Sequence, residues 1–115
     1  MHWTGAFVLT LGLEAAFIGA VRATTPVFRS ISLAKFALLL LGANLLTHPV
    51  VWHLSGSAWA DGNPVTAMVS LEAFAILTEG AIYARAASIP WPMALLTSLG
   101  ANLLSLGVGL ILLTS

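Results

Sequence analysis

The amino-acid sequence predicts an all-α membrane protein with four transmembrane helices. Of the 115 residues, 59% are hydrophobic and 7% are charged, whereas about 25% of the residues in an ordinary soluble domain are charged. Four basic and four acidic residues cannot cover the surface of a soluble globule of this length. The apolar residues also fall into four long runs separated by short polar segments, which is typical of a chain that crosses a bilayer several times.

The four predicted spans begin and end at polar or turn-forming residues. They cover roughly Gly5–Val21, Leu33–Leu54, Val65–Ala86 and Trp91–Thr114. A spanning helix needs about 20 mostly apolar residues, so all four qualify, the first at the short end of the range. The first run contains Glu14 and is not preceded by basic residues, so we interpret it as a permanent helix rather than a cleaved signal peptide.

The basic residues predict how the chain is oriented. Arg22, Arg29 and Lys35 flank the first connection and Arg85 precedes the third, whereas the second contains only Asp61. By the positive-inside rule, the first and third connections are cytoplasmic and both termini lie outside. The four tryptophans fall near span ends, as in an aromatic belt: Trp3, Trp52, Trp59 and Trp91. We therefore expect a multi-pass protein of a prokaryotic inner (cytoplasmic) membrane.

The two halves of the chain share a pattern at an offset of 58 residues. Leu41–Leu46 recurs letter for letter as Leu99–Leu104, and Glu14 matches Glu72. Apolar letters match easily by chance, but a shared Glu and a shared Asn are rare in a membrane interior. We interpret residues 1–115 as one transmembrane domain made of two parallel two-helix repeats related by a pseudo-two-fold axis along the membrane normal. The repeats cover about 5–54 and 65–114, and chance similarity between apolar segments is the alternative.

Each repeat places one carboxyl and one carboxamide near the middle of its spans, Glu14 with Asn44 and Glu72 with Asn102. A charged side chain at the bilayer centre costs at least about 2.5–3.5 kcal/mol. We therefore expect protonated carboxyl groups that pair with the Asn side chains between the two helices of a repeat. Two interpretations are open: hydrogen bonds that hold the helices together, or a protonatable or ion-coordinating centre.

Further polar residues predict a track that continues from this centre. His48 lies one turn from Asn44, and Glu79 lies two turns from Glu72 on the same helix face. The candidate track comprises His48, Glu79, Tyr83, Ser98 and Ser105.

Each of these positions also has a simpler explanation. Glu79 could pair with Arg85 or Arg22 at the interface, and His48 could bond a carbonyl freed by a kink at Pro49. Glycines of the first and fourth spans predict close helix approach: Gly12, Gly19, Gly100, Gly107 and Gly109.

No metal or cofactor site is predicted. The chain has no cysteine, and His48 and His53 lie about 140° apart around a helix, which is unsuitable for sharing one ion. A single axial bond from His48 to a pigment is the alternative. Nucleotide-binding, hydrolase and metalloprotease motifs are absent, and no basic patch suggests nucleic acid. We expect no enzyme.

One segment resembles a pattern in small uncharacterised prokaryotic membrane proteins. Asn44-Leu45-Leu46-Thr47-His48-Pro49, followed by Glu72 and Glu79 and ending in Tyr83, is similar to their N-L-x-T-x-P segment before a helix with two glutamates. The resemblance covers less than half of the chain, and it implies four spans and no activity. The second repeat departs from it, because Ser105, Leu106 and Gly107 replace Thr47, His48 and Pro49.

These observations support two hypotheses of function. The first is permeation or transport of protons or of a small ion or solute through the polar centre. The second is a non-catalytic structural or accessory subunit of a larger membrane complex, in which the polar residues serve helix packing. Because so small a bundle has little interior, we expect a homo-oligomer or other membrane subunits as partners within the lipid bilayer.

Overall fold

Every regular element of the computed structural model, which describes residues 3–114, is a helix. The four long helices are α1 (Trp3–Thr24), α3 (Leu33–Ser55), α5 (Pro64–Ala86) and α6 (Trp91–Thr114). Each is long and apolar enough to cross a membrane, so the prediction of four spanning helices is confirmed, with ends that agree to within three residues. Side chains are described for residues 4–112, and the predicted belt position of Trp3 lies outside them.

Two short helices, α2 (Pro26–Arg29) and α4 (Ala58–Gly62), occupy connections that the sequence predicts as loops. Both are too short for a hydrophobic period to reveal them, but residues that favour helix starts are present. Pro26 opens α2, where its missing amide is not needed. The Ser57 side chain accepts a hydrogen bond from the Ala60 amide at 3.4 Å and caps α4.

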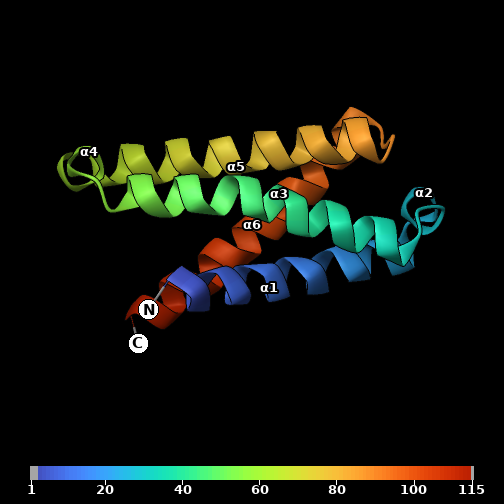
Figure 1. Ribbon diagram of the computed structural model, residues 1–115, viewed down its shortest axis with the longest axis horizontal. Helices are drawn as coiled ribbons and strands as arrows, with labels where there is room; N and C mark the ends of the chain where they lie inside the picture. The colour runs from blue at the N-terminus through green and yellow to red at the C-terminus, as the bar shows by residue number, and fades with distance from the viewer. Residues whose placement is uncertain (1–2, 115) are drawn as a thin grey trace.

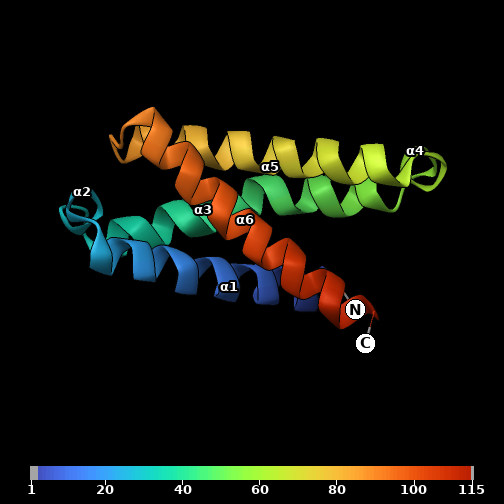
Figure 2. The same cartoon turned by 180° about the vertical axis from the view of Figure 1, so that it is seen from behind.

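The four long helices form a ring in the order α1, α3, α5, α6, in which each contacts its two neighbours. The diagonal pairs, α1 with α5 and α3 with α6, make no close backbone contact. Both ends of the described chain lie with α4 at one end of the bundle, and α2 lies with the α5–α6 connection at the other (Figure 1). Seen from behind, α6 crosses the bundle obliquely (Figure 2).

Charge is divided between the two ends of this bundle. The chain's Lys and Arg residues all lie near the end formed by α2 and the α5–α6 connection: Arg22, Arg29, Lys35 and Arg85. Asp61 lies in α4 at the opposite end. The assignment of the basic end to the cytoplasm is a prediction from the positive-inside rule.

Two glycines allow close contact between helices. A Cβ atom on Gly80 of α5 would lie 2.8 Å from Leu95 Cδ2 and 3.4 Å from Leu95 Cα on α6, and one on Gly100 would overlap the Phe17 ring of α1. At Gly12, Gly19, Gly107 and Gly109, no atom lies within 4 Å of such a Cβ. The prediction of close approach is therefore wrong at these four glycines, because open space surrounds them.

We expect Gly100→Ala to lower the free energy of unfolding by about 1 kcal/mol, because the Phe17 ring must leave its place between α1 and α6. Thermal unfolding in detergent, followed by circular dichroism, measures the change. Gly107→Ala on the same helix is the control, since open space receives its methyl group. Equal stability of the two variants would show that Gly100 does not determine how α1 packs on α6.

Candidate functional site

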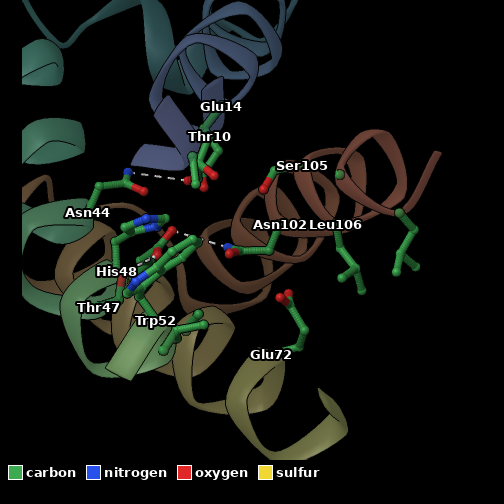
Figure 3. Close-up of a pocket in the computed structure, with 16 residues that line it drawn as sticks. Thr10, Glu14, Asn44, Thr47, His48, Trp52, Glu72, Asn102, Ser105 and Leu106 are labelled. Carbon is green, nitrogen blue, oxygen red and sulfur yellow. Dashed lines mark hydrogen bonds between the residues drawn. The ribbon is translucent and has the colours of Figure 1, made fainter. Parts of the chain in front are cut away.

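A cavity of about 200 Å³ opens between the four long helices, all of which line it; it is called the polar cavity after the polar side chains in its wall. Its walls come from the first half of α1, the middle of α5 and the second halves of α3 and α6, so it lies toward the end of the bundle formed by α4 and the termini. Figure 3 shows the polar side chains that line it: Thr10, Glu14, Asn44, Thr47, His48, Glu72, Asn102 and Ser105.

Glu14 and Asn44 form one part of the cavity floor. The Asn44 Nδ2 group donates a hydrogen bond to Glu14 Oε1 at 3.4 Å and another to the Leu40 carbonyl at 3.0 Å. The two side chains are 0% and 1% exposed. The expected pairing of Glu14 with Asn44 is thus present, and it joins α1 to α3.

Glu79 forms the other part of the floor and joins three helices. It accepts hydrogen bonds from Thr47 Oγ1 of α3 at 2.8 Å and from Asn102 Nδ2 of α6 at 3.1 Å, and it is 1% exposed. The expected pairing of Asn102 with Glu72 is therefore wrong, because Asn102 bonds Glu79 instead.

Glu79 also does not form an ion pair with Arg85 or Arg22 at the membrane interface. The side chain is buried in the bundle, whereas Arg85 is exposed. Arg22 Nε donates to the Ile31 carbonyl at 3.1 Å. Glu79 therefore belongs to the interior, where hydrogen bonds and not a cation satisfy its oxygens.

The two floor glutamates meet across the diagonal of the ring. Glu14 and Glu79 line the same cavity and lie close enough for their charges to act on each other, although their helices make no close backbone contact. Oε2 of Glu14 is buried and accepts no hydrogen bond from an amide or hydroxyl group of the described residues. Two ionised carboxylates in this apolar setting would repel each other strongly, and a shared proton or a cation between them would relieve that repulsion.

Glu72 lies on the way from the floor to the α4 end. It is half-buried and lines both the polar cavity and a second cavity of about 410 Å³, which is also lined by Ser55 and Asp61. The two cavities share Val51, Glu72 and Leu106 in their walls. Acidic groups thus mark a route from α4 to the floor.

The other half of the bundle is filled by apolar side chains, so the predicted polar track does not continue to the α2 end. The core there includes Ile18, Phe28, Phe36, Leu40 and Ala94. Tyr83 is 0% exposed within this core and lies 6.2 Å from Phe36 between ring centroids. Its hydroxyl has no hydrogen-bond partner in the described part of the chain. The hydroxyl nevertheless lies close enough to Glu79 and Glu14 to interact with them electrostatically.

The other predicted site residues lie partly in the lining of the polar cavity and partly outside it. Ser105 and His48 line the polar cavity, and the His48 ring packs against Phe7 and Trp52 at centroid distances of 5.3 and 6.2 Å. Ser98 lies outside the cavity lining and donates to the Ile76 carbonyl at 2.8 Å, which joins α6 to α5. Pro49 lies inside α3, which continues as a helix to Ser55.

Two threonines of the site were not predicted. Thr47 bonds Glu79, and Thr10 lines the cavity one turn from Glu14. The signal for both was present, because Thr10 is four residues before Glu14 and Thr47 three residues after Asn44, spacings that place side chains on one helix face. Threonine is common in membrane helices as a partner of its own backbone, which is why the pattern alone does not single it out.

Neither a cluster of metal ligands nor a similar protein identifies what this site binds. Among the residues with described side chains, no group of three or more His, Cys, Asp or Glu is placed to hold a metal ion. Comparison of the chain with protein-family models, curated proteins and solved structures finds no match, so its function has to be inferred from the site.

Proposed function

We propose that this membrane protein binds a proton or a small cation at the Glu14–Glu79 pair and moves it across the bilayer. The observation that carries the proposal is the meeting of two fully buried carboxyl groups at the floor of a polar cavity. Carboxyl groups inside a membrane are expensive, and they are typical of proton and ion pathways.

The charge balance of the interior supports a positively charged occupant. Glu14, Glu72 and Glu79 all line the cavity, and their charges act on one another. No Lys or Arg is among the residues that line it. A proton or a cation is therefore the partner that lowers the electrostatic energy of the site.

Transport from this site needs a change of shape. The floor residues are closed to water, and the apolar core separates them from the α2 end. We propose that the two repeats, 5–54 and 65–114, tilt against each other to open that side. The ring order supports this architecture, because exchanging α1 with α5 and α3 with α6 leaves the order unchanged.

One observation favours the alternative, an accessory subunit in which the polar residues serve packing. Glu79 links three helices through Thr47 and Asn102, and interhelical hydrogen bonds of this kind are common in membrane proteins. Packing does not explain the cavity, or why Glu14 Oε2 is buried with no hydrogen bond from an amide or hydroxyl group of the described residues. We therefore rank transport first.

Proton flux into liposomes tests the proposal. Purified full-length chain is reconstituted with an internal pH-sensitive dye, and a potassium diffusion potential drives proton entry; sodium- and potassium-sensitive dyes report cation flux in parallel. We expect wild type to exceed protein-free liposomes. Glu79→Gln should reduce the flux to the protein-free level, because an amide keeps the size and the acceptor oxygen but cannot exchange a proton or hold a cation as strongly.

Ser70→Ala is the matched control for this measurement. Ser70 lies on α5 like Glu79, but it is exposed and does not line the polar cavity. Its flux should equal that of wild type. Wild-type flux of protons, sodium and potassium that all equal the protein-free background would overturn the transport proposal and leave the accessory role.

A further inference from the structure

A crevice that is separate from both cavities described above lies between α1 and α3 near the α2 end of the bundle. Its volume is about 190 Å³. The deeper wall is formed by buried apolar residues such as Ile18 and Phe36, whereas Ala15, Gly19 and Ala37 on its rim are exposed. The crevice therefore opens sideways, toward the surface that faces lipid in a spanning bundle.

The shape of the crevice suits an extended hydrocarbon chain. It reaches along α1 from Arg22 to Ala15, two turns or about 10 Å of helix axis. A helix of a partner protein is about 10–12 Å wide with its side chains, too wide to enter a space of about 190 Å³. An acyl chain from the surrounding bilayer is narrow enough.

The mouth of the crevice carries positive charge. Arg22 lines it, and the hydrogen bond from its Nε to the Ile31 carbonyl fixes the guanidinium beside the opening. Lys35 follows on the first turn of α3, and Arg29 lies on α2. The chain's acidic residues lie elsewhere, Asp61 in α4 and the three glutamates in the interior. This end is therefore complementary to an anionic headgroup.

We infer that the α1–α3 crevice binds one acyl chain of an anionic phospholipid whose phosphate lies against Arg22. The lipid fills space that no protein side chain fills, since a Cβ added at Gly19 meets no atom within 4 Å. The guanidinium offers several N–H donors to the phosphate oxygens, which suits Arg better than Lys for this contact. The inference is independent of the transport proposal, because the crevice and the polar cavity share no lining residue.

Native mass spectrometry of the full-length chain in detergent tests this site with phosphatidylglycerol and phosphatidylcholine of identical acyl chains. We expect wild type to retain one phosphatidylglycerol in preference to phosphatidylcholine. Arg22→Gln should weaken phosphatidylglycerol binding about fivefold, the effect of one basic residue near a headgroup, and Arg22→Lys should restore most of it. Gly19→Leu should weaken binding of both lipids, because the leucine fills the crevice.

Two matched variants separate this site from general effects. Arg85→Gln removes one charge from the same end of the bundle, and Gly12→Leu adds the same side chain at another open glycine of α1, outside the crevice. Both should bind like wild type, and thermal unfolding checks that every variant is folded. The inference is overturned if Arg85→Gln weakens binding as much as Arg22→Gln, or if Gly19→Leu binds like wild type. Should Arg22→Gln not fold, the comparison of Gly19→Leu with Gly12→Leu still decides the outcome.

Discussion

Replacement of Glu79 by leucine is expected to lower the free energy of unfolding by about 2 kcal/mol, the cost of leaving buried donors without their acceptor. Thr47 and Asn102 both donate to this carboxyl group, and they are 2% and 5% exposed. Each also donates a hydrogen bond within its own helix, to the carbonyls of Ala43 at 3.0 Å and Ser98 at 2.9 Å. The loss is therefore a few kcal/mol at most and not the full cost of two orphaned groups.

Unfolding in detergent, followed by circular dichroism, measures this loss against two related variants. Glu79→Gln keeps an acceptor oxygen and should therefore lose less stability than Glu79→Leu, about 1 kcal/mol at most. Glu72→Leu makes the same replacement on the same helix, at a carboxyl group whose Oε2 accepts no hydrogen bond from the described residues, and should destabilise little. If Glu72→Leu and Glu79→Leu lose equal stability, the hydrogen bonds of Glu79 are not what joins α3, α5 and α6.

Helix positions in this protein follow directly from the sequence. Each span is a single apolar run, and proline, serine and glycine mark its ends, so composition alone places α3, α5 and α6 to within one residue. The first span is three residues longer at its C-terminal end than predicted, because Arg22 lies inside α1. There its stem extends along the apolar surface while the guanidinium reaches the Ile31 carbonyl.

The depth of the glutamates was harder to predict, because residue counting locates Cα atoms and not carboxyl groups. Helical side chains lean toward the N-terminus of their own helix. Glu79 therefore carries its carboxyl group about one turn toward Pro64, back to the middle of α5, whereas Glu72 carries its own away from the middle. Asn102 leans in the opposite direction on antiparallel α6 and bonds the Ser98 carbonyl at 2.9 Å. Because the side chains of Glu79 and Asn102 point in these directions, Asn102 reaches Glu79 and not Glu72.

The division of the bundle into a polar and an apolar half depends on tertiary structure. From the helical spacing alone, Tyr83 is predicted to be the next polar residue after Glu79 on one face of α5. In the fold, its ring packs near Phe36 in the core and only its hydroxyl faces toward the glutamates. α6 crosses the bundle obliquely (Figure 2), and a pattern of single residues carries no information on a crossing angle.

Cysteine labelling should show a large difference in reaction rate between the polar and the apolar half of the bundle. The chain has no native cysteine, so only the introduced cysteine reacts. We expect Ser105→Cys, in the cavity wall, to react with a cationic, membrane-impermeant thiosulfonate about 100 times faster than Leu103→Cys. Leu103 is on the same helix but is 52% exposed on the outer surface of the bundle, where lipid excludes both water and the reagent. Ala94→Cys, in the apolar core of the α2 end, should not react measurably.

The same variant measured in sealed vesicles of each orientation tests which end of the bundle faces outward. Positive-inside orientation places the cavity and both termini on the outer side, so Ser105→Cys should react in right-side-out vesicles and be protected in inverted ones. Reaction in inverted vesicles alone would show that the orientation is wrong while the cavity is correct. Reaction in vesicles of both orientations would show that the apolar core does not close the α2 end of the resting protein.

Labelling also connects the cavity to the proposed transport. The reagent leaves a positive charge on Ser105→Cys in the same cavity as Glu14, Glu72 and Glu79, where it competes with a proton or cation for the carboxyl groups. We expect proton flux in liposomes to fall with the same time course as labelling and to recover when a reducing agent removes the group. If the labelled protein keeps its full flux, the conducted species does not pass through this cavity. That conclusion holds regardless of how much the carboxyl pair at the cavity floor contributes to stability.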